Sequence, residues 1–212
     1  GYAPDDRDAL MKITRECFEA KCPWPTIRAQ WIARMDKSAD AFLADEVTRQ
    51  TLSDSRVIEK RGAIVVPNVG VKLTCMADRI DITPDGQALI YDYKTGVVPS
   101  EKQQENFDKQ LLLEAAMVER GAFTDVGITP VQAATFIGVN TTMKNSPAPL
   151  AKNPPDQVWA ELETLFVHWK RIDRGYTARI ALFSKTDYSP YDHLSRFGEW
   201  DTSDDPKPQV LT

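Results

Sequence analysis

The chain has 212 residues, 42% of them hydrophobic, and a formal net charge of −5 from 26 basic and 31 acidic side chains. This fits one domain with a substantial core, and no apolar run reaches the length of a membrane helix. The acidic balance argues against a chain that grips DNA by itself, since Lys and Arg supply most affinity for phosphates. Three unpatterned cysteines and a polar N-terminus without a signal peptide favour a reducing cytoplasm.

Two helices are predicted at the start of the chain. The first covers residues 5–21, and the segment 23–25, which holds two prolines, ends it. Thr26 is a suitable N-cap for a second, long helix that reaches about residue 49. Its aromatic residues are expected in helix packing rather than base stacking, and its basic residues on a solvated face, with DNA contact as the alternative: Trp31 and Phe42; Arg28, Arg34, Lys37 and Arg49.

Residues 56–66 predict a strand that leads into a β-hairpin. The hairpin strands are residues 72–82 and 88–94, and residues 83–87, Thr-Pro-Asp-Gly-Gln, signal the turn between them. Glu59 lies on the strand before the hairpin. It is either a surface or ion-pair residue, or an accessory acid for the site that the hairpin carries.

The hairpin gathers two carboxylates and one ammonium. Residues equidistant from a turn centred on Asp85 face each other, so Asp78 lies opposite Asp92 with Cβ atoms about 5 Å apart. Asp92 and Lys94 are two apart on one strand and therefore point to the same face. Carboxylates hold Mg²⁺, and a bound metal activates water and neutralises phosphate charge. The pattern therefore predicts metal-dependent phosphodiester cleavage, in which Lys94 orients the water.

The alternative is a solvated strand face with ordinary cross-strand ion pairs. The apolar neighbours favour the site, because they predict that both faces of the hairpin are covered: Met76, Ile80 and Ile90 on the face of the acids, and Leu89, Tyr91 and Tyr93 on the other. Two like charges on a covered strand are costly unless a cation joins them.

Residues 100–120 give the clearest helix signal. Ser100 and Gln103 form a capping-box pattern, and Gly121 supplies a C-terminal stop. Gln103 and Gln110 are seven apart and are predicted to share a face, with capping as the alternative role of Gln103. The buried stripe is predicted to hold Phe107, Leu111, Ala115 and Val118.

The last third of the chain predicts a strand at 131–140, a Pro-rich loop at 145–155, and a helix from Pro155 to about Arg174. A polar and aromatic tail begins after Lys185. His168 is expected at the surface or in packing rather than as a ligand. The helical repeat predicts a core stripe of Val158, Leu162, Leu165, Trp169 and Ile172.

The hairpin and the segment that leads from it to Gln103 resemble the nuclease motif of the PD-(D/E)XK superfamily, in its RecB-like branch. Two further stretches, residues 102–117 and 191–200, are similar to the AddB subunits of bacterial AddAB helicase–nucleases. The residues that carry the nuclease motif are Asp78, Arg79, Asp81, Gly86, Asp92, Lys94, Thr95, Gly96, Pro99 and Gln103.

The resemblance implies an α/β fold with a restriction-endonuclease-like core, a central mixed sheet flanked by helices. It predicts an N-terminal helical segment at 1–50, a nuclease core at 51–185 and a C-terminal tail at 186–212. The implied activity is a divalent-metal-dependent DNA exonuclease that processes double-strand break ends. It would act on single strands or unwound duplex ends beside a helicase–nuclease partner subunit, in the bacterial cytoplasm and away from membranes.

The resemblance also assigns roles to single residues. It implies that the catalytic set is Asp78, Asp92 and Lys94, with Gln103 or Gln110 as the helical glutamine and Glu59 as an accessory acid. Mg²⁺ or Mn²⁺ would be held by Asp78, Asp92 and the backbone carbonyl of Tyr93. Two alternatives stay open: a non-catalytic, nuclease-like scaffold domain of a DNA-repair subunit, and an unrelated metal-dependent phosphoesterase.

The sequence departs from the family in two respects. The family histidine upstream of the hairpin has no counterpart before Asp78, because His168 and His193 are both downstream. We therefore expect the chain alone to be a weak nuclease. Some AddB subunits bind an iron–sulfur cluster through four cysteines, and three cysteines cannot supply four thiolates, so no cluster is predicted.

Overall fold

The computed structural model describes residues 3–140, 144–173, 190–201 and 203–205. The chain divides into two compact units, Gly1–Trp159 and Ala160–Thr212. The predicted boundaries at 50 and 185 remain predictions, and the stretch 174–185 of the predicted core lies outside the described residues. Among the described residues, no helix combines the length and apolar composition that crossing a bilayer requires.

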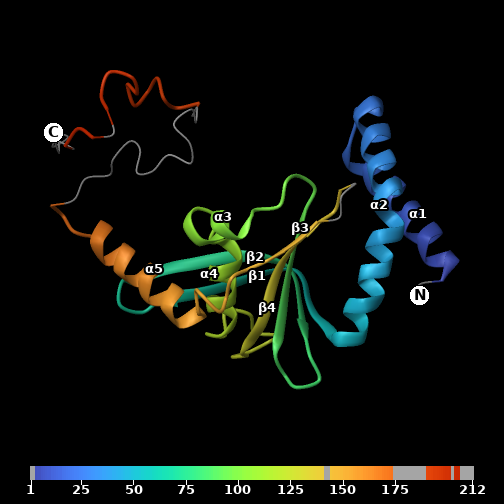
Figure 1. Ribbon diagram of the computed structural model, residues 1–212, viewed down its shortest axis with the longest axis horizontal. Helices are drawn as coiled ribbons and strands as arrows, with labels where there is room; N and C mark the ends of the chain where they lie inside the picture. Colours follow the sequence, from blue (N-terminus) through green and yellow to red (C-terminus); the bar gives the residue numbers. More distant parts are fainter. Residues whose placement is uncertain (1–2, 141–143, 174–189, 202, 206–212) are drawn as a thin grey trace. The chain divides into compact units, whose positions relative to one another are not determined.

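Figure 1 shows the helices and strands in chain order. The helices are α1 (Pro4–Lys21), α2 (Pro25–Leu52), α3 (Glu101–Asn106), α4 (Gln110–Val118) and α5 (Pro155–Trp169). The strands are β1 (Asp54–Val66), β2 (Val71–Ile82), β3 (Ala88–Lys94), β4 (Val131–Gly138) and β5 (Asn145–Pro147). The predicted strands are present, and so are the predicted helices, of which the one at 100–120 is divided in two.

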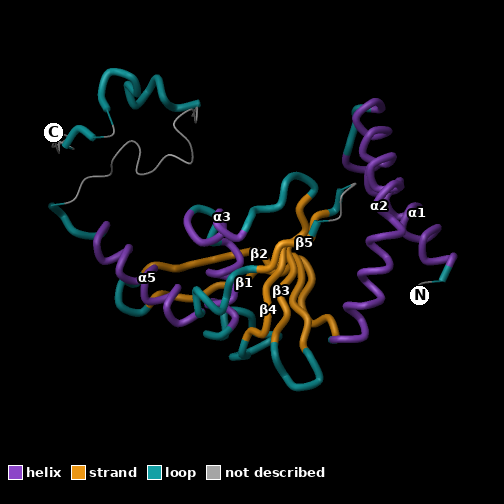
Figure 2. The backbone as a smooth tube through the Cα atoms, in the orientation of Figure 1, coloured by secondary structure: helices purple, strands orange, loops and turns teal. Residues whose placement is uncertain are grey.

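The strands form one mixed sheet in the order β1-β2-β3-β4-β5, visible as adjacent tubes in Figure 2. Neighbouring strands are antiparallel except β3 and β4, which are parallel. A parallel pair needs a long crossover connection, and α3 and α4 provide it between β3 and β4. The predicted α/β fold, a central mixed sheet flanked by helices, is confirmed.

The β2–β3 hairpin has the predicted register. Ile80 pairs with Ile90 and Asp81 with Leu89, which centres the turn on Asp85. Gly86 supports this turn because its φ of +77° is a conformation that glycine adopts without a Cβ penalty. The same register places Asp78 and Asp92 opposite each other, directly beyond the last pair of the β2–β3 ladder.

Helices lie against both faces of the sheet at the hairpin. Tyr91 and Tyr93 face α2, where the rings of Tyr93 and Phe42 have centroids 6.2 Å apart. Asp92 and Lys94 face α4, whose Gln110 contacts both side chains. The prediction that both faces of this hairpin are covered is correct, and Asp92 is consequently buried at 4% exposure.

An ionic network ties α2 to β2. Arg79 donates from its Nε and Nη2 to the two carboxylate oxygens of Asp81, at 2.6 and 2.7 Å. Its Nη1 donates to both oxygens of Glu46 on α2, each at 2.7 Å. Ser53 donates to Asp81 at 3.1 Å, and the Asp81 side chain is fully buried. The network therefore fixes the end of α2 against the strand that carries Asp78.

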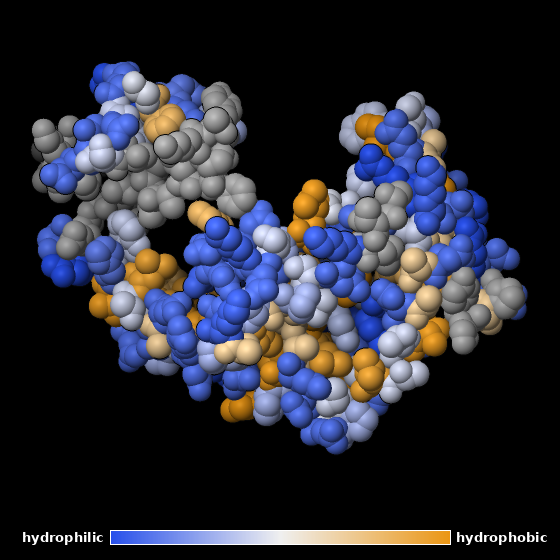
Figure 3. All heavy atoms as spheres, viewed as in Figure 1, coloured by the Kyte–Doolittle hydropathy of each residue, from blue (hydrophilic) through white to orange (hydrophobic). Residues whose placement is uncertain are grey.

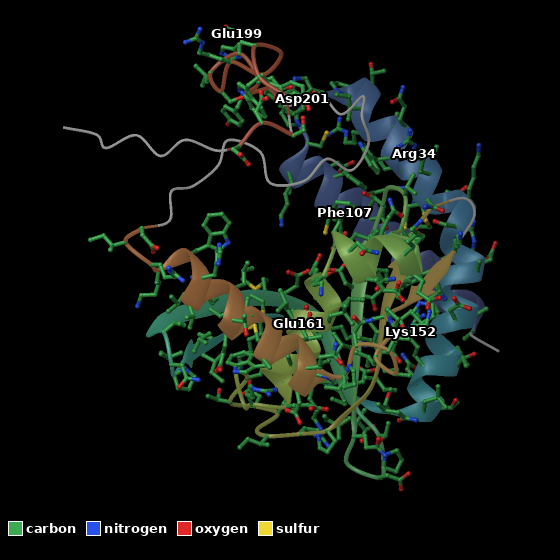
Figure 4. The ribbon with its side chains drawn as sticks, turned by 60° about the vertical axis from the view of Figure 1, so that its left-hand side comes forward. Arg34, Phe107, Lys152, Glu161, Glu199 and Asp201 are labelled. Atoms are coloured by element: carbon green, nitrogen blue, oxygen red, sulfur yellow. The ribbon has the colours of Figure 1, made fainter. Side chains whose placement is uncertain are left out.

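The helix predicted at 100–120 is two helices. Asn106 and Asp108 have low helix propensity, and the Asn106 amide bonds the backbone carbonyl of Lys102. The backbone N–H groups of Phe107 and Asp108 both donate to the Gln103 carbonyl, which closes α3. Phe107, labelled in Figure 4, lies in this break and is 52% exposed, so its predicted burial is wrong.

Three other predictions from local pattern are corrected. Residues 145–147 are not loop but the short strand β5, which pairs with β4. Met76 is 52% exposed because its half of β2 pairs with β1 and runs beyond the β3 pairing. In the α5 stripe Val158 is buried, whereas Leu165 is 51% exposed and Ile172 lies beyond the helix, fully exposed. A helical repeat is buried only where another element covers it.

Gly62→Ala is expected to destabilise the fold by about 1–3 kcal/mol, the usual range for overpacking a core. A Cβ at Gly62 would lie 2.5 Å from Cζ of Phe123, a residue that is only 2% exposed and is therefore enclosed by other groups. Urea unfolding measures the loss. Gly96→Ala is the matched control, because nothing lies within 4 Å of its Cβ position. Equal stability of the two variants would contradict this packing.

Candidate active site

Asp78 and Asp92 lie at the end of the β2–β3 ladder, where the strand pairing stops at Arg79 and Tyr91. The Asp78 carboxylate takes the place of the next ladder bond, since its Oδ2 accepts from the backbone N–H of Tyr93 at 2.8 Å. This bond holds the Asp78 side chain beside the backbone of β3. The two acids are close enough for the charge of Asp78 to raise the pKa of Asp92.

Asp92, Lys94 and Gln110 form a closed triangle of polar contacts. The Gln110 amide donates from Nε2 to Asp92 Oδ1 at 2.5 Å, and its Oε1 accepts from Lys94 Nζ at 3.0 Å. Lys94 Nζ lies 2.8 Å from Asp92 Oδ2, in an ion pair without hydrogen-bond geometry. Gln110 thus orients the carboxylate and the ammonium together.

The environment of Asp92 opposes its ionisation. Burial is the main cause that raises the pKa of Asp92, and the charge of Asp78 adds to it. The Lys94 ammonium and the Gln110 amide act in the opposite direction. A buried carboxylate next to a second carboxylate is a costly arrangement for stability alone, and it is typical of sites that bind a cation.

Glu114 is a fourth ionisable residue at this place, and reasoning from the sequence missed it. It lies on α4, one helical turn after Gln110, and is only 3% exposed. Burial raises the pKa of Glu114 to about 8, with smaller contributions from Asp92 and Asp78. The available signal was a single acid inside the apolar run Leu-Leu-Leu-Glu-Ala-Ala-Met-Val of residues 111–118.

The two candidate glutamines occupy different places. Gln103 accepts at its side-chain oxygen from the backbone N–H of Ser100 at 2.8 Å, which completes the predicted capping box of α3. Gln110 contacts Asp92 and Lys94 from α4. Because the helix breaks between them, they do not share the face that a continuous helix predicts. The geometry favours Gln110 as the glutamine of the site.

Glu59 lies across from Asp78 in the β1–β2 register, between the pairs Ile58–Arg79 and Lys60–Ala77. Its φ of +48° is uncommon for a residue with a Cβ, and its side chain is exposed. The strand pairing thus places Glu59 next to the site, and its accessory role remains a prediction.

The side chains of His168 and His193 are both exposed, and exposure is what was expected for His168. The cysteines Cys17, Cys22 and Cys75 are not in disulfides. Burial, aided by Glu114, raises the pKa of the Cys75 thiol to about 12, so this thiol stays protonated at neutral pH.

The residues of the site fit a hard divalent cation. Asp78, Asp92 and Glu114 offer oxygen donors only, which is the donor type that Mg²⁺ and Mn²⁺ prefer. Within the described part of the chain, Asp92 Oδ2 and Glu114 Oε1 are both buried without a hydrogen bond. Among the same residues, no three His, Cys, Asp or Glu side chains already lie close enough together to share one ion. The fit is therefore to an ion held by few protein ligands and by water.

Without metal, folding stability is expected to fall as pH rises between the ordinary pKa of glutamate, 4.5, and the raised pKa of Glu114, about 8. In this window the folded chain keeps the Glu114 proton and the unfolded chain has released it. The folded state then binds more protons, so a rise in pH favours unfolding. The charged groups that face Glu114 are Asp78 and Asp92, which add to the effect, and Lys94, which opposes it.

Urea unfolding in the presence of a chelator at about pH 5 and about pH 9 tests this dependence. Glu114→Gln should match the parent at the lower pH and exceed its stability by roughly 4 kcal/mol at the higher pH. The contribution of Asp92, which has the same sign, stays in the variant. An equal fall in stability for parent and variant would show that Glu114 is not the group responsible.

A mixed α/β sheet with two aspartates and a lysine where the ladder between two strands ends is the arrangement of a metal-dependent nuclease core. Comparison with protein families agrees with this class. The PD-(D/E)XK nuclease superfamily model matches residues 2–191, so the chain belongs to that superfamily.

Similar proteins occur in Rickettsia. An uncharacterized protein of Rickettsia conorii is 27% identical over 123 residues, which is 57% of this chain and 15% of that protein. An uncharacterized protein of Rickettsia bellii is 25% identical over 122 residues, which is 56% of this chain and again 15% of that protein. The chain therefore spans only a small part of the curated relatives that it matches.

Proposed function

We propose that this chain is the catalytic domain of a divalent-metal-dependent DNA exonuclease in the RecB-like branch. Its parent would be an AddB-type subunit that processes double-strand break ends beside a helicase–nuclease partner. The observation that carries the proposal is the triangle of Asp92, Lys94 and Gln110 next to Asp78. Neither a surface ion pair nor a structural core needs a buried aspartate, Asp92, next to a second carboxylate, Asp78.

The roles of the residues are inferred from their contacts. Asp78 and Asp92 would hold the ion, with the backbone carbonyl of Tyr93, since the Tyr93 N–H already fixes Asp78. A divalent cation bound there would neutralise charge on the scissile phosphate and lower the pKa of a bound water. Lys94 would position that water, because Gln110 holds its ammonium beside the Asp92 carboxylate.

Three observations support DNA as the substrate and a larger assembly as the setting. Superfamily membership implies a nucleic-acid substrate. The relatives are far longer than this chain, so further DNA-binding surface would lie in other parts of the parent. The net charge of −5 agrees with a DNA grip outside this domain. A bacterial cytoplasmic setting is supported by the resemblance of residues 191–200 to AddB subunits and by the bacterial origin of the relatives.

The test is cleavage by purified protein that contains this chain. The substrates are single-stranded and duplex DNA labelled at one end or the other, with Mg²⁺, with Mn²⁺, or with chelator. We expect metal-dependent release of short products from DNA ends, and the position of the label gives the polarity. Circular DNA of the same sequence is the control, since an exonuclease leaves it intact.

Other results would contradict the proposal in recognisable ways. Hydrolysis of a small diester such as bis(p-nitrophenyl) phosphate without DNA cleavage would indicate the phosphoesterase alternative. Metal binding without hydrolysis of any of these substrates would indicate the non-catalytic scaffold. Cleavage of circular and linear DNA at equal rates would support a nuclease function but contradict the assignment as an exonuclease.

A further inference from the structure

Glu114 is a strongly buried acid of the site that the proposed chemistry does not use. Its exposure is only 3%, and within the described part of the chain its Oε1 has no hydrogen-bond partner. Leaving such a group unpaired in the interior costs free energy, and an apolar residue of similar size would avoid that cost. A carboxyl retained at this place therefore indicates a partner that is absent from the chain itself.

The direction of Glu114 is set by α4. Residues four apart on a helix lie on the same side, so Glu114 is on the side of Gln110, whose amide contacts Asp92 and Lys94. The charges of Asp92, Asp78 and Lys94 all act on Glu114, which places the carboxyl within electrostatic range of the whole site. The Glu114 carboxyl is therefore on the side of α4 that contacts Asp92.

The acids carry three potential negative charges, from Asp78, Asp92 and Glu114, against the single positive charge of Lys94. The carboxylate of Asp92 is already paired with Lys94 and Gln110. Within the described part of the chain, Lys94 is the only cation whose charge acts favourably on the Glu114 carboxylate. A divalent ion would correct this imbalance.

We propose that Glu114 is a positioning residue of the metal site, a carboxylate that accepts a hydrogen bond from a water molecule of the ion held by Asp78 and Asp92. This inference rests on the proposed function and goes beyond the ligands assigned there. Glu114 is not a direct ligand, because no three such acids of the described chain lie close enough to share one ion. Mg²⁺ keeps several of its waters in protein sites, and those waters need acceptors.

The experiment measures Mn²⁺ binding by isothermal titration calorimetry, without substrate. It compares the parent protein with Glu114→Gln, Glu114→Leu, Asp92→Asn and Glu101→Gln. Glu101→Gln is the matched control, because Glu101 is exposed on α3 and pairs with Lys152. A thermal melt of each variant in chelator shows that it folds, and both Glu114 variants should fold because each removes a buried, unpaired acid.

We expect both Glu114 variants to bind Mn²⁺ about 10- to 100-fold more weakly than the parent, the effect of losing an outer partner of a metal site. Glu101→Gln should bind as the parent does, and Asp92→Asn should lose binding. Parent-like binding by the Glu114 variants, with binding lost in Asp92→Asn, would overturn this inference and leave the proposed function intact. Absence of Mn²⁺ binding by the folded parent would overturn both.

Discussion

Asp92→Ala is expected to lower metal-dependent DNA cleavage by roughly 1,000-fold or more in kcat/KM, which corresponds to about 4 kcal/mol of lost transition-state stabilisation. Asp92 is the acid that contacts both Lys94 and Gln110, so its removal takes away a proposed ion ligand and releases the ammonium. Cleavage of end-labelled DNA by the proposed helicase–nuclease complex measures the loss. Duplex unwinding by the same complex should be unchanged, since the substitution is local to β3.

Substitutions at the partners of Asp92 sharpen this test. Lys94→Ala should lose cleavage to a similar degree, and Lys94→Arg should not restore it, because a planar guanidinium cannot replace the compact ammonium beside Gln110. Gln110→Ala should lose about 10- to 100-fold, as expected when the group that orients a ligand is removed. Loss of unwinding together with cleavage would instead indicate a structural role for these residues.

The two glutamines give an internal comparison. Gln103→Ala removes the α3 capping box and should cost about 1 kcal/mol of stability with little effect on cleavage. Gln110→Ala should instead lower cleavage and have little effect on stability. If Gln103→Ala proved the more damaging to cleavage in a folded protein, the placement of the family glutamine at Gln110 would be wrong.

Arg79→Ala is expected to destabilise the fold by about 3–5 kcal/mol, the cost of breaking a buried ion pair on one side. Arg79 binds Asp81 and Glu46 through hydrogen bonds of 2.6–2.7 Å. Without Arg79, the fully buried carboxylate of Asp81 keeps the hydroxyl of Ser53 as a donor but loses the positive charge that balances it. Urea unfolding near neutral pH measures the loss.

Arg7→Ala is the control for Arg79→Ala. Like Arg79, Arg7 binds two carboxylates. Its partners are Asp36 and Asp40, both on α2, and all three side chains are about a third or more exposed. Exposed pairs of this kind are screened by water and contribute little to stability. A cost for Arg79→Ala no greater than that for Arg7→Ala would show that the Arg79 network does not hold α2 on the sheet.

The loop after β3 carries an exposed apolar side chain. Figure 3 shows hydrophilic side chains over α3 and an apolar patch at the tip of the loop after β3, where Val97 is 94% exposed. This loop directly follows Lys94 in the chain.

The sequence alone determined the hairpin and the gathering of Asp78, Asp92 and Lys94. This was possible because a short turn sets the register of an antiparallel pair, and strand alternation then sets which residues share a face. The turn at residues 83–87 is local, and so is the two-residue spacing of Asp92 and Lys94. The capping of α3 by Ser100 and Gln103 is local for the same reason.

Only the tertiary structure decided which glutamine reaches the site and that Glu114 joins it. Both depend on how α4 packs against the sheet, and on the helix break at Phe107, which no periodic pattern of the segment 100–120 contains. The same holds for Arg79, whose partner Glu46 is 33 residues away in the chain. Burial and charge balance at this site arise between distant segments, and a local pattern cannot record them.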